Sequence, residues 1–299
     1  MTLEELLKKV RAIEILSRRL VKEKLQGDFR SAFRGTGMQF KEFRNYVYGD
    51  DVRHISWNVS ARTADPVLKV FEEERDRVLM LVVDVSASLR KGPWAHAKAE
   101  KLAEVAATLA LSAAESRDKF GLILFSDRVE RIVPPGKGRT QLLRVIREIL
   151  AFEPLGTKTS PAVALKRLLT LLKRRSIVVL LSDLEVLPEE TLLKRVARNH
   201  AFAAIHVEHP HEWTPPKIPC FIEVETAESE RPVTLDVSQQ SFLDFLGQFG
   251  KRRRSTMNKH FRECGATLLH LSTDQDTLPL LRDFFRTAGR GQSPTDSKR

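Results

Sequence analysis

The sequence Val78-Leu79-Met80-Leu81-Val82-Val83-Asp84-Val85-Ser86-Ala87-Ser88 joins an unbroken apolar run to an aspartate and two alternate serines. Such a run favours a strand buried on both faces, as in a parallel sheet covered by helices. Open α/β sheets place their ligand sites at the carboxyl ends of strands, where Asp84, Ser86 and Ser88 fall. One carboxylate and two hydroxyls suit a hard divalent ion such as Mg2+. A strand followed by a serine-rich turn without a metal would have the same sequence pattern, so this stretch alone makes the metal site only a hypothesis.

Strands and helices alternate along the rest of the chain. Apolar runs predict further strands at 120–126, 129–133, 176–183, 201–207, 221–224, 233–237 and 266–271. Helical spacing predicts helices at 94–117, 141–152, 162–172, 242–264 and 277–287, with another opening at 188–190. This alternation predicts an α/β fold with a doubly wound, mostly parallel sheet and right-handed crossovers.

Two later segments complete the pattern begun by the first strand. Leu155-Gly156-Thr157-Lys158-Thr159-Ser160-Pro161 opens an apolar helix, and the strand at 176–183 ends in Asp183. A strand with D-x-S-x-S, a threonine in a loop before a helix and a strand ending in aspartate resemble a von Willebrand factor A domain. The resemblance implies a metal-ion-dependent adhesion site formed by Asp84, Ser86, Ser88, Thr159 and Asp183. Thr157 also fits a G-T-x-T pattern, and Thr159 is preferred for its spacing to the helix.

The same resemblance implies how such a site works. Asp183 is expected to act through water or a hydroxyl. One coordination position of the ion is expected to stay open for a partner's carboxylate.

Residues 27–77 carry a second, more specific set of motifs. F-R-x-Y-x-x-G-D-D-x-R-x-I-x-W runs from Phe43 to Trp57, A-R follows at 61–62, and F-E-E-E-R-D-R follows at 71–77. In this order, before D-x-S-x-S, the motifs resemble the family called domain of unknown function fifty-eight, over about residues 27–286. The resemblance implies a von Willebrand A protein associated with MoxR-type AAA+ ATPases. Ser56 departs from the family pattern, in which an aspartate is usual before the tryptophan.

Alternating charge in this segment predicts ion pairs. Asp50 or Asp51 would bind Arg53, and the glutamates at 72–74 would bind Arg62 or Arg75, because arginine suits bidentate pairing with carboxylates. The favoured interpretation is a small β-rich annex held by these pairs. The alternative is an exposed partner surface, with the candidate partner-binding residues Arg53, Trp57, Arg62 and Thr157.

Composition limits the classes of protein. The chain has 299 residues, a net charge of +11 and 42% hydrophobic residues. It lacks the apolar run of about 18–20 residues that spans a bilayer, and its N-terminus lacks a signal-peptide core, so we expect a soluble, cytoplasmic protein. Cys220 and Cys264 are isolated and are expected to be reduced thiols. The basic run Lys251–Arg254 is interpreted as a solvated helix face rather than a nucleic-acid site.

The expected layout has four parts. An amphipathic helix at 1–26 precedes the annex at 27–76, and a von Willebrand A-like domain at 77–288 precedes a polar tail at 289–299.

A further group of imidazoles invites a zinc interpretation. His206 lies on a predicted strand that leads into Glu208-His209-Pro210-His211-Glu212. His206 alternates with the strand residues and is expected to point elsewhere, which leaves no evident third nitrogen or sulfur ligand for a tetrahedral set, so a polar loop is favoured.

The sequence contains no catalytic set on a nucleophile elbow, so a non-enzymatic protein is favoured. The leading hypothesis is a Mg2+-dependent adaptor that grips an acidic residue of another protein. The family resemblance implies that this adaptor works with a MoxR-type AAA+ ATPase that acts on a client protein. The alternative is a metal-dependent hydrolase, in which the same acids and ion activate water.

Overall fold

The computed structural model describes residues 38–48, 50–63, 65–73, 77–214, 221–224, 233–236 and 239–290. The chain divides into two compact units, one of Arg34–Arg77 and one of Met1–Phe33 with Val78–Arg299. The predicted helix at 1–26 and Cys220 lie outside the described residues. None of the described helices is long and apolar enough to cross a bilayer.

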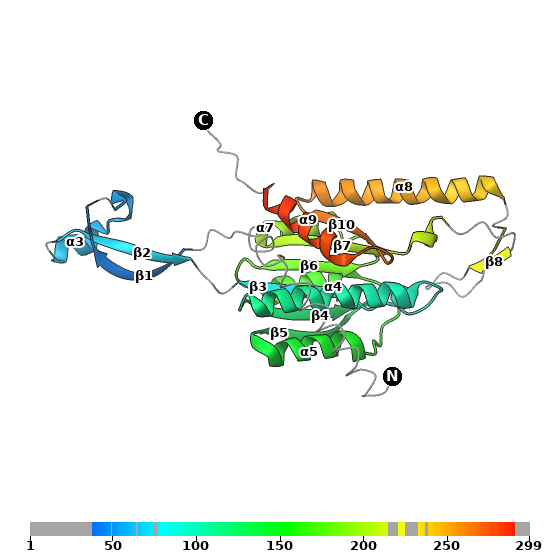
Figure 1. Ribbon diagram of the computed structural model, residues 1–299, viewed down its shortest axis with the longest axis horizontal. Helices are drawn as coiled ribbons and strands as arrows, with labels where there is room; N and C mark the ends of the chain where they lie inside the picture. The colour runs from blue at the N-terminus through cyan, green and yellow to red at the C-terminus, as the bar shows by residue number, and fades with distance from the viewer. Residues whose placement is uncertain are drawn as a thin grey trace. The chain divides into compact units, whose positions relative to one another are not determined.

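The larger unit is built on a six-stranded sheet with the order β10-β7-β6-β3-β4-β5 (Figure 1). The strands are β3 Val78–Asp84, β4 Lys119–Phe125, β5 Val129–Gly136, β6 Ile177–Ser182, β7 Ala201–Glu208 and β10 Thr267–Ser272. Neighbouring strands pair in parallel except β4 and β5, which are antiparallel. The predicted doubly wound, mostly parallel α/β sheet is therefore confirmed.

Helices cover both faces of this sheet. They are α4 Ala95–Glu115, α5 Gly138–Ala151, α6 Pro161–Leu171, α7 Glu190–Asn199, α8 Gln240–Glu263 and α9 Thr277–Arg290. Alternate residues of a strand point to opposite faces. On β3, Leu79 and Leu81 pack in the core with α4, α5 and α9, whereas Met80 and Val82 pack in the core with α6, α7 and α8. The unbroken apolar run of β3 is thus explained by burial on two sides.

Two short strands, β8 Phe221–Val224 and β9 Val233–Asp236, pair antiparallel. They form a separate two-stranded sheet at the positions where the sequence predicts strands.

The smaller unit is a hairpin with two short helices. Strand β1 Met38–Asn45 pairs antiparallel with β2 Val67–Glu73, and η2 Val52–His54 and α3 Trp57–Thr63 connect them. Ser56, the departure from the family pattern, is 6% exposed, and its N–H donates to the carbonyl of Val67. Its backbone joins the connection to β2.

Charged pairs of the smaller unit agree in part with expectation. The predicted pair of Asp51 and Arg53 is confirmed, with Arg53 Nη2 2.8 Å from Asp51 Oδ2. Asp50 instead pairs with Arg44 at 2.9 Å. The side chains of the glutamates at 72–74 lie outside the described residues.

Candidate metal centre

The two aspartates predicted as metal ligands lie at one edge of the sheet. Asp84 is the last residue of β3, and Asp183 follows the last residue of β6. Because β3 and β6 are parallel neighbours, their carboxyl ends meet. Asp84 is 2% exposed and Asp183 3%, so two carboxylates are buried close together.

Hydrogen bonds fix the orientation of the Asp84 carboxylate. Oδ1 accepts the backbone N–H of Ser86 at 2.9 Å, and Oδ2 accepts the hydroxyl of Ser182 at 2.7 Å. The Ser182 hydroxyl accepts the backbone N–H of Leu184 at 2.9 Å. Ser182 therefore joins the loop after β6 to the carboxylate at the end of β3, a role that the sequence interpretation missed.

The predicted serine ligands lie directly after Asp84. Ser86 is buried and Ser88 is partly buried, and their Oγ atoms are 3.1 Å apart. Ser88 lies in the short helix η3 Ala87–Leu89. Two hydroxyl oxygens thus lie next to one another within four residues of Asp84.

The threonine loop is tied to the serine loop by its backbone. The N–H of Ala87 donates to the carbonyl of Thr157 at 3.1 Å. Thr159 is 9% exposed, whereas Thr157 is exposed. The burial difference favours Thr159 as the side chain that belongs to the buried group.

A close backbone approach holds this loop in place. A Cβ on Gly156 would lie 2.1 Å from both Ser126 Oγ and Asp127 Oδ1, so no larger residue fits without a shift. The Gly156 N–H donates to Glu130 Oε1 at 2.7 Å, and Arg90 Nη2 donates to the Gly156 carbonyl at 2.7 Å.

A buried lysine, which the sequence interpretation missed, contacts the second aspartate. Lys98 of α4 is 5% exposed, and its Nζ lies 3.2 Å from Asp183 Oδ2 and 2.8 Å from Glu212 Oε1. Burial lowers the pKa of Lys98, but the charges of Asp183 and Glu212 outweigh it, so the pKa is raised overall. Lys98 is therefore a fixed cation at the site.

The single ammonium group of Lys98 does not neutralise the buried carboxylates of this site. Burial, and then the charge of Asp183, raise the pKa of Asp84 to about 7. The Oδ1 atom of Asp183 is buried, and no residue that the structure describes donates a hydrogen bond to it. A buried carboxylate oxygen without a donor is costly unless a cation or water meets it. The oxygen-only ligands and this orphaned atom fit a hard divalent cation.

The imidazoles of the loop after β7 have structural roles. His209 stacks on Trp94 with ring centroids 3.9 Å apart, and its side chain accepts the N–H of His211 at the start of η4 Pro210–Glu212. His206 on β7 is 4% exposed, and burial holds its pKa well below the usual range. The ring of His206 contacts the ring of His270 on β10 rather than those of His209 and His211.

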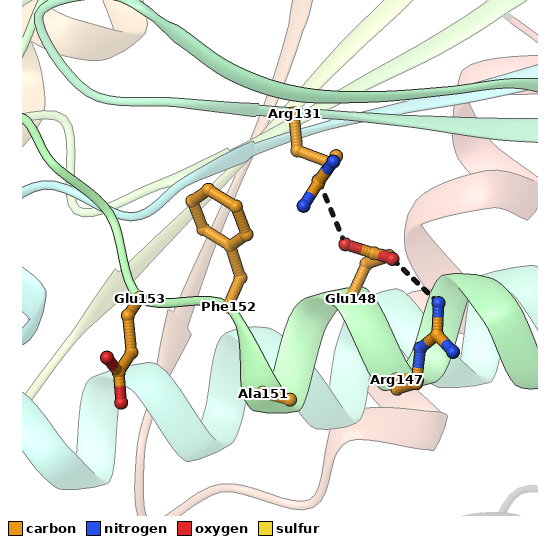
Figure 2. A pocket seen from close by; sticks show the side chains of 6 residues that line it. All are labelled: Arg131, Arg147, Glu148, Ala151, Phe152 and Glu153. Carbon is orange, nitrogen blue, oxygen red and sulfur yellow. Dashed lines mark hydrogen bonds and ion pairs between the residues drawn. The ribbon is translucent and has the colours of Figure 1, made fainter.

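A surface hollow of about 350 Å³ lies where α5 ends beside β5 (Figure 2). Glu148 pairs there with Arg131 at 3.1 Å and with Arg147 at 3.0 Å. Both guanidinium groups therefore have an anionic partner, and the hollow contains none of the predicted site residues.

Three of the predicted partner-binding residues belong to the smaller unit. Trp57 is 70% exposed, and Arg53 and Arg62 are exposed. Arg53 makes a bidentate contact with Asp51, from Nε to Oδ1 and from Nη2 to Oδ2. The fourth, Thr157, is exposed in the threonine loop of the larger unit.

The fold and the site define a class: a doubly wound α/β domain with buried acids and hydroxyls at the carboxyl edge of its sheet. The model of the family described as "Protein of unknown function DUF58" matches residues 42–255. The chain belongs to this family, as its ordered motifs predict.

Other proteins match this chain over most of its length. The chain is 29% identical over 286 residues to an uncharacterized protein of Mycobacterium bovis, and the match covers 94% of this chain and 89% of that protein. Among solved structures, an aerotolerance-related membrane protein from Bacteroides fragilis matches with a TM-score of 0.44 and 11% identity, over 72% of this chain and 99% of that one. The von Willebrand A domain of SpRpn10 matches with a TM-score of 0.38 and 13% identity, over 73% and 95%.

Proposed function

We propose that this chain is a non-enzymatic, cytoplasmic adaptor that uses a divalent cation to hold a carboxylate of a partner protein. The observation that carries the proposal is the meeting of Asp84 and Asp183, both buried, at one sheet edge, with Asp183 Oδ1 lacking a hydrogen-bond donor among the described residues. Oxygen ligands favour Mg2+, which keeps several of its coordination positions for water or an incoming oxygen.

In this proposal Asp84, Ser86 and Ser88 hold the ion, with Thr159 from the second loop and Asp183 acting through water or a hydroxyl. The bound ion supplies positive charge for a carboxylate from outside. Lys98 pairs with Oδ2 of Asp183, and Oδ1 of Asp183 has no hydrogen-bond donor among the described residues.

Exposed apolar residues in the site loops support a protein partner rather than a small anion. Leu155, in the threonine loop, is 80% exposed, and Val186, in the loop after Asp183, is 40% exposed. Apolar side chains around a charged centre are typical of protein interfaces, where they exclude water from the central contact.

The family resemblance supplies the proposed partners, a MoxR-type AAA+ ATPase and a client protein. The test is capture of a MoxR-type ATPase of the same organism on the immobilised chain, with Mg2+ and with EDTA. Asp84→Asn is the site variant, and Asp127→Asn is a matched control with a carboxylate after β4 at the same edge. The proposal expects capture to be lost with EDTA and with Asp84→Asn only.

Equal capture under all four conditions would remove the metal role. The same proteins are assayed with phosphoesters. Turnover that Asp84→Asn abolishes would favour the metal-dependent hydrolase.

A further inference from the structure

We propose that His206, Glu208 and His270 form a second metal site, for a transition metal such as Zn2+, with ligands distinct from those of the proposed Mg2+ site. The three side chains come from the neighbouring strands β7 and β10. Their ligand atoms all lie within 4.8 Å of one another. His206 and Glu208 are 4% and 2% exposed, so two of the three ligands are buried.

Strand register explains why residues so distant in the chain meet. His206 and His270 are direct partners in the parallel pairing of β7 with β10, so their side chains point to the same face of the sheet. Glu208 lies two residues after His206 and therefore shares that face. Helix α8 packs against β10 (Figure 1) and supplies Arg254 and Asn258 as neighbours.

The contact between the two imidazoles requires something between them. Their Nδ1 atoms are 2.9 Å apart. Two lone pairs cannot face each other at this distance, so either a ring proton or a cation lies between them. Two tetrahedral zinc ligands at about 2.0–2.1 Å from the ion are about 3.3 Å apart, so a small opening of this pair admits the metal.

A supporting hydrogen bond selects the nitrogen of His270 that binds. The Nε2 of His270 lies 3.1 Å from Asn258 Oδ1. When this nitrogen carries the proton and donates it to the amide oxygen, Nδ1 keeps its lone pair and faces His206. Metal-binding histidines commonly donate their second ring N–H to a carbonyl or carboxylate in this way.

The third ligand is a carboxylate with a counter-charge. Arg254 pairs with both oxygens of Glu208, with Arg254 Nε 3.0 Å from Oε2. A carboxylate has about four lone-pair positions, so Glu208 can keep this partner and bind a metal. The Arg254 side chain is 49% exposed, so it can turn to solvent when a cation is bound. Arg254 thus weakens the site without closing it.

The ligand types distinguish this site from the proposed Mg2+ site. Two imidazoles and one carboxylate suit zinc and related first-row transition metals, whereas oxygen ligands alone suit magnesium. Three protein ligands leave the fourth position of a tetrahedral ion open to water or another ligand. His270 is partly exposed on the edge strand β10, which gives the metal a route from solvent.

The experiment has two titrations of the full, metal-stripped chain. Binding of ZnSO4 is measured by calorimetry, and binding of CoCl2 is measured by visible absorption. Both titrations are done in an Asp84→Asn background, so that the proposed Mg2+ site does not contribute, and repeated in the wild type. We expect one Zn2+ per chain and a cobalt spectrum typical of tetrahedral imidazole ligation. His270→Gln and Glu208→Gln are expected to weaken binding at least tenfold.

Two controls test the location of the site. His211→Gln removes a nearby imidazole outside the cluster and is expected to leave zinc affinity unchanged. Arg254→Gln is expected to raise the affinity severalfold, because it removes a positive charge, and Arg252→Gln, an exposed arginine of the same helix, is expected not to.

The proposal is overturned if the chain binds no stoichiometric Zn2+, or if His270→Gln and Glu208→Gln bind it as the parent does. Loss of binding in His211→Gln would also overturn it. His206 is buried, so His206→Gln can fail to fold. In that case zinc binding by His270→Gln tests the proposal, because His270 is partly exposed. Magnesium binding by the wild type is measured separately, so the two sites succeed or fail independently.

Discussion

Replacing Asp84 by asparagine is expected to stabilise the metal-free protein at pH 8. The substitution keeps the shape of the side chain and removes a charge that is fully buried near Asp183. In the folded chain the pKa of Asp84 is raised from 3.8 to about 7, which corresponds to a free energy on the order of 4 kcal/mol. Asparagine must donate where Asp84 accepts the Ser182 hydroxyl, which costs about 1–2 kcal/mol. The expected net gain is about 2–3 kcal/mol.

The sign of the pH dependence follows from proton binding. Between pH 3.8 and about 7 the folded chain holds a proton on Asp84 that the unfolded chain has lost. The contribution of Asp84 to the free energy of unfolding is therefore fully present below pH 3.8, falls as the pH rises through this window, and is lost above about pH 7. Asparagine does not titrate, so the advantage of the variant grows between pH 5 and pH 8.

The assay is urea unfolding in EDTA at both pH values, followed by circular dichroism. Carboxylates away from the sheet edge titrate alike in both proteins, so the difference between the two proteins isolates Asp84 together with its interaction with Asp183. Asp127→Asn is the control, because that carboxylate is partly exposed at the same edge, and we expect a change within about 0.5 kcal/mol. Saturating Mg2+, at about 100 times its Kd, would stabilise the wild type by about 2.7 kcal/mol and the variant not at all. A difference that stays constant from pH 5 to pH 8 would refute the reasoning.

Two further substitutions test the packing of the site. Lys98→Met leaves Asp183 and Glu212 without their buried cation, so the free energy of unfolding is expected to fall by about 3–5 kcal/mol. The control is Lys91→Met, at an exposed lysine, which is expected to change the free energy of unfolding little. A loss below about 1 kcal/mol in Lys98→Met would contradict the assignment of Lys98 as a buried counter-charge. Gly156→Ala places a Cβ 2.1 Å from Ser126 Oγ, so a loss of about 1–3 kcal/mol and weaker Mg2+ binding are expected. Gly247→Ala is the matched control, because a Cβ added there, in α8, meets open space. Its free energy of unfolding, measured in denaturant, is expected to rise by about 0.5–1 kcal/mol. Equal effects of the two substitutions would show that the threonine loop tolerates the added Cβ.

The ends of the strands could be predicted from sequence because they depend on local pattern. An apolar run buried on two faces must stop where Asp84 begins, and the run before Asp183 stops in the same way. Parallel pairing then brings both aspartates to one edge, whichever strands lie between them. The alternation of strands and helices likewise indicates the doubly wound fold without any knowledge of strand order.

Contacts between distant residues could not be predicted in this way. Lys98 and Asp183 are 85 positions apart, and His206 and His270 are 64 apart. The first pair depends on which turn of α4 faces the sheet edge, and the second on the register of β7 with β10. A slip of one residue in that register would turn His270 to the opposite face, away from His206. The sequence alone therefore determined the strands and the edge where the acids gather, while only the tertiary structure decided which cation meets Asp183 and which imidazole meets His206, because packing and register are set by the whole core.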